Sequence, residues 1–240
     1  MKLIKLSLAT LLLSTLTACG SGGGGSADTS SNTNNAQPPR PTTLQSSEVK
    51  GHRYKGSSTV VREDTEVTTN KNILVINGQQ ITLIPTGFSS ATYIASDASS
   101  KRLIDNSFNY LKHGFYEDLA NSKSYFFVQG NETLVQNIPT SGQVNYSGKT
   151  VTGKHNSNAI SSGTVNFTVD FQARTLSGTA TGGELSTPVE LRANITGNTF
   201  QGTHNNTLTE GRFYGQAAEE MGGTFFKNNE FLGSFGAKKQ

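Results

Sequence analysis

Apolar and polar residues alternate in short runs through the second half of the chain. In the run 163–171, valines and phenylalanines at every second position are separated by Thr, Asn and Asp, so one face lies in a core and the other in water. The same period of two recurs in the run 188–195, and turn signals such as Asn205-Asn206 separate the runs. The pattern predicts strands at residues 142–148, 163–171, 174–181, 188–195, 198–204, 211–215, 222–227 and 230–236.

Regular short strands joined by tight turns favour an up-and-down antiparallel β-barrel, because closure removes unpaired strand edges. A barrel of eight short strands has an interior just wide enough to be filled by its own side chains. We therefore expect little free cavity, so that ligands meet loops or the outer wall. The candidates for the interior are Phe167, Phe171, Phe200, Phe213, Phe225 and Phe235.

The first half of the chain is strand-rich but less regular. Two apolar runs around Asn77-Gly78 predict a hairpin with a type I′ turn, since Asn and Gly tolerate the positive φ required at both centres. A short helical turn is expected at residues 116–121. Pro139 is expected to mark the seam between two domains. The predicted fold class is all-β, with an irregular strand-rich N-terminal domain (48–137) followed by a small eight-stranded antiparallel β-barrel (138–240).

The N-terminus has the layout of a secretory signal peptide over residues 1–18, with Lys2 and Lys5 ahead of an apolar run. This run is too short to cross a bilayer, which requires about 20 helical residues. Residues 19–47 contain Cys19, the only cysteine, followed by a stretch rich in Gly, Ser, Asn and Pro that cannot bury enough apolar surface to fold. We expect this stretch to be a disordered tether.

The residues that precede Cys19 are Leu16-Thr17-Ala18. This tetrapeptide resembles the bacterial lipobox, and the resemblance implies that Cys19 is lipidated and becomes the N-terminus. Because Gly20 replaces the Asp that retains enterobacterial lipoproteins at the inner membrane, an outer-membrane location at the cell surface is expected. The alternative is an ordinary signal peptide followed by an unrelated thiol.

Charge and motifs exclude several classes of function. Without the signal peptide, 18 basic residues face 17 acidic ones, and they are interspersed singly, so the sequence lacks the basic stripe of a nucleic-acid-binding protein. The four histidines are scattered, and no pair has the i, i+4 spacing of a helical zinc site. The sequence also lacks a G-x-S-x-G elbow and a P-loop. We therefore predict neither an enzyme nor a metal site.

Haem binding requires an axial His or Tyr beside apolar loops. His113 is the best candidate, because it lies between Tyr110, Phe115 and Tyr116. His52 and Tyr54 are a weaker second choice. The alternative for His113 is a histidine in a surface loop without a ligand.

The segment 211–226, GRFYGQAAEEMGGTFF, closely resembles the signature of the transferrin-binding-protein-B-like barrel, and IPTSGQVNYSG (138–148) resembles the first strand of that family. The resemblance extends over roughly residues 124–240. We interpret the signature as an element that closes the barrel, with Glu220 accepting hydrogen bonds from backbone amides of its own loop. The matching residues are Gly211, Phe213, Tyr214, Gly215, Ala218, Glu220, Gly222, Gly223 and Phe225.

The resemblance implies a small surface lipoprotein of the group that includes haemophilins, haemoglobin-binding lipoproteins and factor H-binding protein. We expect it to bind a host protein (haemoglobin or transferrin) or haem for iron or haem acquisition, and to pass the cargo to an outer-membrane transporter. The main alternative is an immune-evasion lipoprotein that binds a complement regulator. A third interpretation is a structural lipoprotein without a host ligand.

Overall fold

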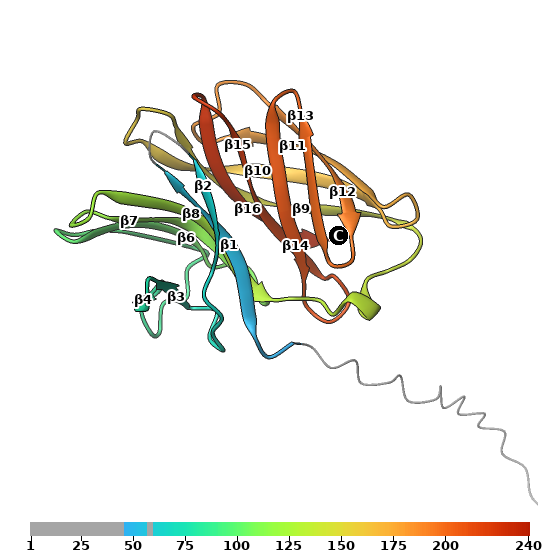
Figure 1. Cartoon of the computed structure of the whole chain (residues 1–240), viewed down its shortest axis with the longest axis horizontal. Coiled ribbons are helices and arrows are strands. Elements are labelled where there is room, and N and C mark those ends of the chain that lie inside the picture. The colour runs from blue at the N-terminus through green and yellow to red at the C-terminus, as the bar shows by residue number, and fades with distance from the viewer. Residues whose placement is uncertain (1–45, 57–59) are drawn as a thin grey trace, which may run out of the picture. The chain divides into compact units, whose positions relative to one another are not determined.

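The computed structural model describes residues 46–56 and 60–240, all of which belong to one compact unit. The predicted signal peptide, Cys19 and nearly all of the predicted tether lie outside the described residues. The described part is built from strands: a closed barrel, a six-stranded sheet and a two-stranded sheet (Figure 1). The only helical element in these ranges is a 3-10 turn at Val135–Asn137.

The barrel is an eight-stranded antiparallel meander, as the alternating pattern predicted. Each strand pairs with the next along the chain, and the last pairs with the first. The strands are β9 (Gln143–Lys154), β10 (Ile160–Asp170), β11 (Thr175–Gly182), β12 (Val189–Thr196), β13 (Thr199–His204), β14 (Thr207–Tyr214), β15 (Glu220–Lys227) and β16 (Phe231–Lys239). Most observed strand ends lie within two residues of the predicted ones, and the largest extensions include the end of β9 and the starts of β10 and β14, where cross-strand pairing continues into polar residues beyond the apolar runs.

Side chains from all eight strands form one core inside the barrel. The six phenylalanines predicted to lie there are all buried. Phe213 lies at the centre of an aromatic cluster, with ring centroids 5.5 Å from those of both Phe171 and Phe200. The interior is therefore occupied by the protein's own side chains, and the barrel wall and loops are left for recognition.

The N-terminal part forms a six-stranded sheet with the order β2-β1-β8-β7-β6-β5. The first strand thus pairs with the last one of this part, residues 49–56 against 124–131. The predicted domain seam at Pro139 lies in the connection from β8 to β9, and the division into two domains stays a prediction. The strands are β1 (Val49–Gly56), β2 (Val61–Asp64), β5 (Thr92–Ser96), β6 (Ser100–Asp105), β7 (Leu111–Asp118) and β8 (Lys123–Asn131).

The helical turn expected at residues 116–121 is wrong. Tyr116 is part of β7 and pairs with Tyr125 of β8, and the hairpin closes through a tight turn in which Ser122 has a φ of 49°. Its position in β7 places the Tyr116 side chain in a core cluster with Tyr125 and Phe127, where it is almost completely buried.

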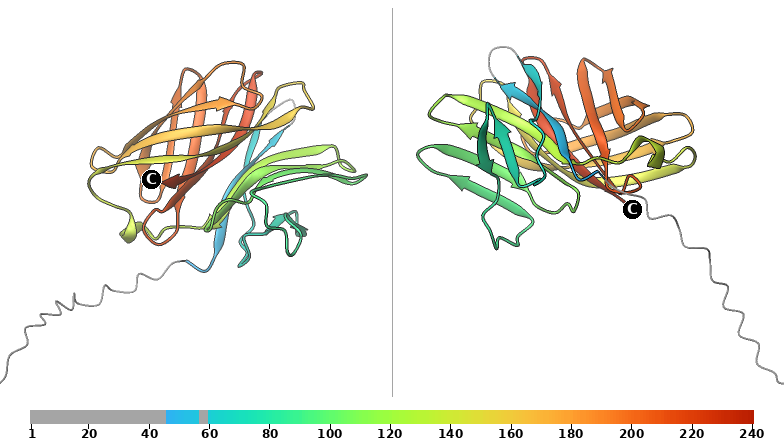
Figure 2. Two further views of the ribbon diagram at one scale, coloured as in Figure 1. Left: turned by 180° about the vertical axis from the view of Figure 1, so that it is seen from behind. Right: turned by 60° about the horizontal axis from the view of Figure 1, so that its bottom comes forward.

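The hairpin predicted around Asn77-Gly78 is confirmed. Its strands are β3 (Ile73–Ile76) and β4 (Gln79–Thr82), and Asn77 and Gly78 have φ values of 51° and 76°. The hairpin covers the face of the six-stranded sheet that is turned away from the barrel (Figure 2). Arg53 Nη1 and Gln129 Nε2 fix it by donating to its backbone carbonyls, at 2.9 and 2.8 Å.

Candidate functional site: the junction of sheet and barrel

The face of the six-stranded sheet that is turned toward the barrel packs on strands β15 and β16. Glycines make this contact close: a Cβ atom on Gly222 would lie 2.9 Å from side-chain atoms of Leu111 and Val128. On Gly236 it would lie 2.7 Å from the ring of Phe108. Both distances are shorter than real Cβ contacts, so any larger residue at these positions would force the buried side chains of the sheet to shift.

Glu220 fixes the sheet to the barrel at one end of this contact. Its carboxylate accepts backbone N–H bonds from Asn109, Tyr110 and Leu111, at 2.7, 2.8 and 3.2 Å. The expectation that Glu220 serves its own loop is therefore wrong, and it is Glu219 that accepts from a loop amide, that of Ala217. Burial raises the pKa of Glu220, and the three amides oppose this by stabilising the charged form.

Two histidines lie in one row of the sheet and face two hydroxyl groups of the barrel. His52 and His113 both pair with Val128, one on each side. His52 Nε2 lies 2.7 Å from Oγ1 of Thr224, and His113 Nδ1 lies 3.2 Å from Oγ of Ser234. Thr224 and Ser234 are themselves cross-strand partners in the barrel wall.

Both imidazoles are held neutral. Burial lowers the pKa of His113 to about 4, and the same cause lowers the pKa of His52 well below its ordinary value. The charges of Arg62 and Arg212 act on His52 in the same direction. Asp105, 3.8 Å from Nε2 of His113, opposes the shift there without cancelling it.

The residues predicted as haem ligands are not at the surface. His52, Tyr54 and His113 expose 1%, 2% and 0% of their area, all at the junction of sheet and barrel. The expectation of apolar loops around His113, and the alternative of a surface-loop histidine, are both wrong because β7 is covered by the barrel. Haem coordination by these side chains stays a prediction, and in this conformation a haem cannot reach them.

The residues of the signature divide between the two sides of the barrel wall. Phe213, Phe225 and Ala218 are buried with the barrel core, and the Ala218 carbonyl accepts a 2.6 Å bond from Tyr146 Oη. Tyr214 faces outward and packs with Leu111 and Val128 of the sheet. The signature therefore closes the barrel and also carries the contact with the sheet, together with Glu220 and Gly222.

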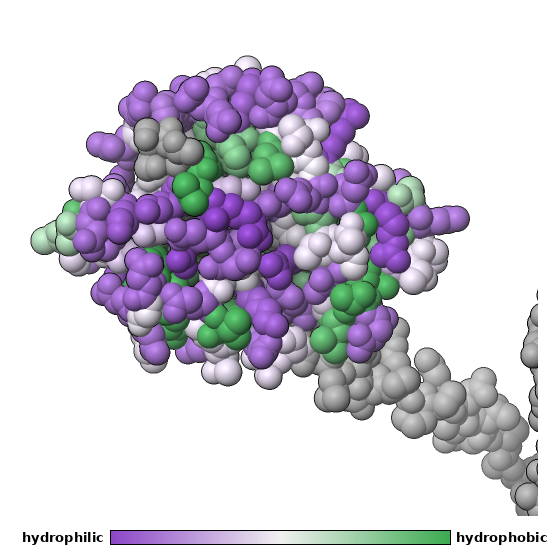
Figure 3. Space-filling model, viewed as in Figure 1, coloured by the Kyte–Doolittle hydropathy of each residue, from purple (hydrophilic) through white to green (hydrophobic). Residues whose placement is uncertain are grey.

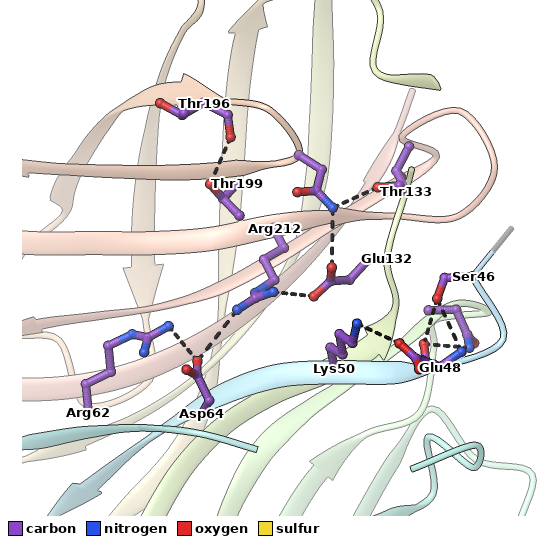
Figure 4. A network of polar contacts seen from close by, with 12 residues as sticks. Ser46, Glu48, Lys50, Arg62, Asp64, Glu132, Thr133, Thr196, Thr199 and Arg212 are labelled. Carbon is purple, nitrogen blue, oxygen red and sulfur yellow. Dashed lines mark hydrogen bonds and ion pairs between the residues drawn. The ribbon is translucent and has the colours of Figure 1, made fainter. Parts of the chain in front are cut away.

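An ionic network covers one margin of the junction (Figure 4). Asp64 of β2 lies 2.8 Å from Nη2 of Arg62 and 3.6 Å from Nη2 of Arg212, and Arg212 also pairs with Glu132. Arg62 Nε donates a 2.7 Å bond to Glu210 of the barrel. These pairs hold the outer strand of the sheet against β14, so this margin is closed.

A groove of about 600 Å³ is open at the end of the junction beside Gly56, the last residue of β1. It lies between the sheet and two barrel hairpins, β9–β10 and β15–β16. Figure 3 shows hydrophobic residues in a hollow near the ends of β2 and β15. The apolar lining of the groove consists of Val60, Phe115, Phe126, Ile160, Phe231 and Leu232. The polar lining includes Glu117, Lys154, His155, Asn156, Asn158 and Lys227.

The groove combines an aromatic and aliphatic lining with two lysines and several side-chain amide groups. This composition fits an apolar side chain of a partner protein surrounded by polar contacts, as in the centre and rim of protein interfaces. The described residues contain no cluster of His, Cys, Asp and Glu that could hold a metal ion. The groove could not be identified from the sequence, because its lining comes from Gly56, Val60 and three further segments, 115–126, 153–160 and 227–232, that lie far apart along the chain.

Residues 138–239 match the family model for the C-lobe and N-lobe β-barrels of Tf-binding protein B. An uncharacterized protein of Haemophilus influenzae is 29% identical over 208 residues, which are 75% of this chain and 71% of that protein. In the described ranges, none of the helices has the length and hydropathy needed to span a membrane.

Solved structures share the fold. Isotype 1 transferrin binding protein B from serogroup B Neisseria meningitidis has a TM-score of 0.66 at 23% identity, over 80% of this chain and 43% of that one. HpuA from Kingella denitrificans, in complex with human haemoglobin, has a TM-score of 0.51 at 16% identity, over 83% of this chain and 85% of that one. This chain thus spans less than half the length of the transferrin-binding protein B chain.

Proposed function

We propose that this chain is a lipid-anchored surface receptor that binds a host iron or haem protein, because residues 138–239 match the model for the β-barrels of Tf-binding protein B. The observation that carries the proposal is the groove at the junction of sheet and barrel. It offers buried aromatic surface with a polar rim, which is the chemistry of protein recognition and not of catalysis.

The position of the groove supports binding of a large external partner. β1 starts at Val49, just after the first described residues, and ends at Gly56, which lines the groove. A strand of this length spans about 25 Å. The segment that leads to Cys19 therefore joins the described part of the protein at the opposite end of β1, so an anchor at Cys19 would leave the groove unobstructed.

The relatives indicate the class of partner. One structural match is named a transferrin-binding protein and another was solved with human haemoglobin. We propose one of these host proteins as the direct ligand, and delivery of its cargo to an outer-membrane transporter as the next step. Free haem is a weaker candidate, because His52, Tyr54 and His113 are buried.

The test is a binding titration of the purified chain with human transferrin and human haemoglobin, followed by pull-down from serum. Lys154→Glu reverses an exposed charge at the groove and should weaken binding at least about tenfold, or about 1.4 kcal/mol. Lys239→Glu is the matched control, since it makes the same charge change at the far end of β16. Equal loss in both variants, or recovery of only a complement regulator from serum, would contradict the proposal.

A further inference from the structure

The two edges of the six-stranded sheet differ in chemistry. β2 has the sequence VRED, and its charged side chains are paired with Arg53, Glu210 and Arg212. β5 has the sequence TYIAS, with no charge and no proline, and no described strand pairs with its outer side. Proteins usually protect free edges with charges, proline or bulges, because an uncharged edge pairs with other strands. The β5 edge has none of these protections.

The backbone groups that β5 turns outward can be assigned from its pairing with β6. The Asn106 amide donates to Ala91 O, and the Asp97 amide donates to Ser100 O. Hydrogen-bonded and non-hydrogen-bonded residue pairs alternate along an antiparallel ladder. Tyr93 and Ala95, like residues 91 and 97, therefore direct their backbone hydrogen bonds inward to β6. The N–H and C=O groups of the alternate residues, 92, 94 and 96, therefore point away from the sheet.

The side chain of Ile94 extends an apolar row beyond the covered part of the sheet. The row crosses five strands in register: Tyr54, Phe126, Phe115, Leu103 and Ile94. The first four expose between 2% and 7% of their area, whereas Ile94 exposes 71%. Ile94 is the most exposed large hydrophobic residue of the described chain. It is also the middle residue of β5.

We propose that a second copy of this chain covers the edge, with the two β5 strands pairing antiparallel about a two-fold axis at Ile94. In this register Ile94 faces Ile94 of the other copy, and Thr92 faces Ser96. All three residues present their backbone groups outward, so each facing pair exchanges two N–H···O bonds. The two apolar rows become continuous, and no like charges meet across the pair. A two-fold axis gives both copies the same contact.

The twist of the sheet makes this dimer compatible with two copies on one surface. Four steps separate β5 from β1, and a twist of about 20–25° per step accumulates to roughly a right angle. Figure 1 agrees, with β6 and β7 running across the view and β1 running up it. A two-fold axis normal to the sheet at β5 therefore runs roughly along β1. Rotation about this axis leaves the β1 strands of both copies pointing in the same direction. Ser46, just before β1, therefore lies on the same side of the dimer in both copies.

The dimer is expected to be weak. A pair of five-residue strands buries less than the roughly 1,200 Å² typical of stable interfaces. Association should therefore depend on concentration in solution. The test is sedimentation equilibrium of the chain from Gly20 to Gln240, which contains the whole compact unit and lacks the predicted anchor.

Three variants distinguish pairing at the β5 edge from non-specific hydrophobic association. Ile94→Lys places a charge at the centre of the pair. Ile94→Pro removes the exposed isoleucine side chain and an outward N–H, so neither variant breaks a backbone hydrogen bond to β6. Each should lower the association constant at least about tenfold. Val135→Lys changes a residue that is 58% exposed in the 3-10 turn and should leave association unchanged. Melting temperatures verify that each variant is folded.

Hydrogen exchange gives a second measurement that needs no variant. The Ile94 amide should become protected as concentration rises, whereas the inward amides of Tyr93 and Ala95 should be protected at every concentration. A chain that remains monomeric up to about 0.5 mM, an Ile94 amide whose exchange is independent of concentration, or an equal effect of Val135→Lys would each overturn the proposal.

Discussion

Acidification should destabilise the junction of sheet and barrel through its two buried histidines. The pKa of His113 is lowered to about 4, and that of His52 is lowered well below its ordinary value, mainly by burial in both cases. In the unfolded chain both side chains titrate near pH 6.5. Below that pH the unfolded state binds a proton that the folded state does not, so stability is complete above about pH 6.5 and falls as the pH decreases.

The magnitude follows from the number of protons. A histidine that stays neutral in the folded protein loses about 1.4 kcal/mol of stability per pH unit below 6.5. Between pH 7 and pH 5 this amounts to about 2 kcal/mol for each histidine and about 4 kcal/mol for both. Domains are typically stable by about 5–15 kcal/mol, so the loss is a large share of the total.

Two carboxylates with lowered pKa values act outside this window. Hydrogen bonds lower the pKa of Asp97 to about 2 and also lower the pKa of Asp118, so the stability that these carboxylates contribute is lost only at more acidic pH. Glu220 acts in the opposite direction, because its raised pKa favours protonation of the folded state. It reduces the net loss near the acidic end of the window.

The assay is urea denaturation followed by circular dichroism at half-unit steps from pH 7 to pH 5. His52→Gln and His113→Gln should each lower stability at pH 7, because the polar contact with Thr224 or Ser234 changes. Each should also remove about half of the pH dependence, and the double variant should remove nearly all of it. A wild-type stability that is constant over this range, or a slope that survives in the double variant, would refute the reasoning.

Three further substitutions test the packing by urea denaturation. Glu220→Gln removes the charge that accepts three backbone N–H bonds, one of them from the buried Leu111 amide. It should lower the free energy of unfolding by about 2–3 kcal/mol, and a decrease below about 0.5 kcal/mol would contradict this role. Phe213→Ala empties the centre of the barrel core and should cost about 3–5 kcal/mol. Gly222→Val should destabilise the protein and increase hydrogen exchange at Val128, because the new valine side chain would clash with Leu111 and Val128. Unchanged exchange at Val128 would contradict the close contact.

The barrel could be predicted from the sequence because its information is local. Residues such as Val165, Phe167 and Val169 alternate with polar residues, and each turn signal lies between two strands that pair with each other. A meander needs little further information, since each strand pairs with the next one along the chain. Only the closing pair, β16 with β9, joins strands that are far apart in the sequence. The hairpin at Asn77-Gly78 was predictable for the same reason.

The candidate site could be predicted only in part. The signature around Glu220 and Gly222 lies within residues 138–239, which match the family model for the β-barrels of Tf-binding protein B. It did not reveal that Glu220 binds amides 109–111, because that contact joins residues far apart in the chain. The aromatic neighbours of His113 indicated a candidate haem ligand, yet the side chain is buried against the barrel, where it contacts Ser234, a residue that no local pattern links to it.

The all-β class, the eight-stranded barrel and its phenylalanine core follow from the amino-acid pattern, since periodicity and turn residues act over a few positions. Tertiary structure decided the order of the six-stranded sheet, the closed face that buries His52 and His113, and the open groove beside Gly56. These features depend on pairing between β1 and β8 and on packing of the sheet on β15 and β16. Such contacts are selected by the burial of whole surfaces, which no short segment of the chain encodes.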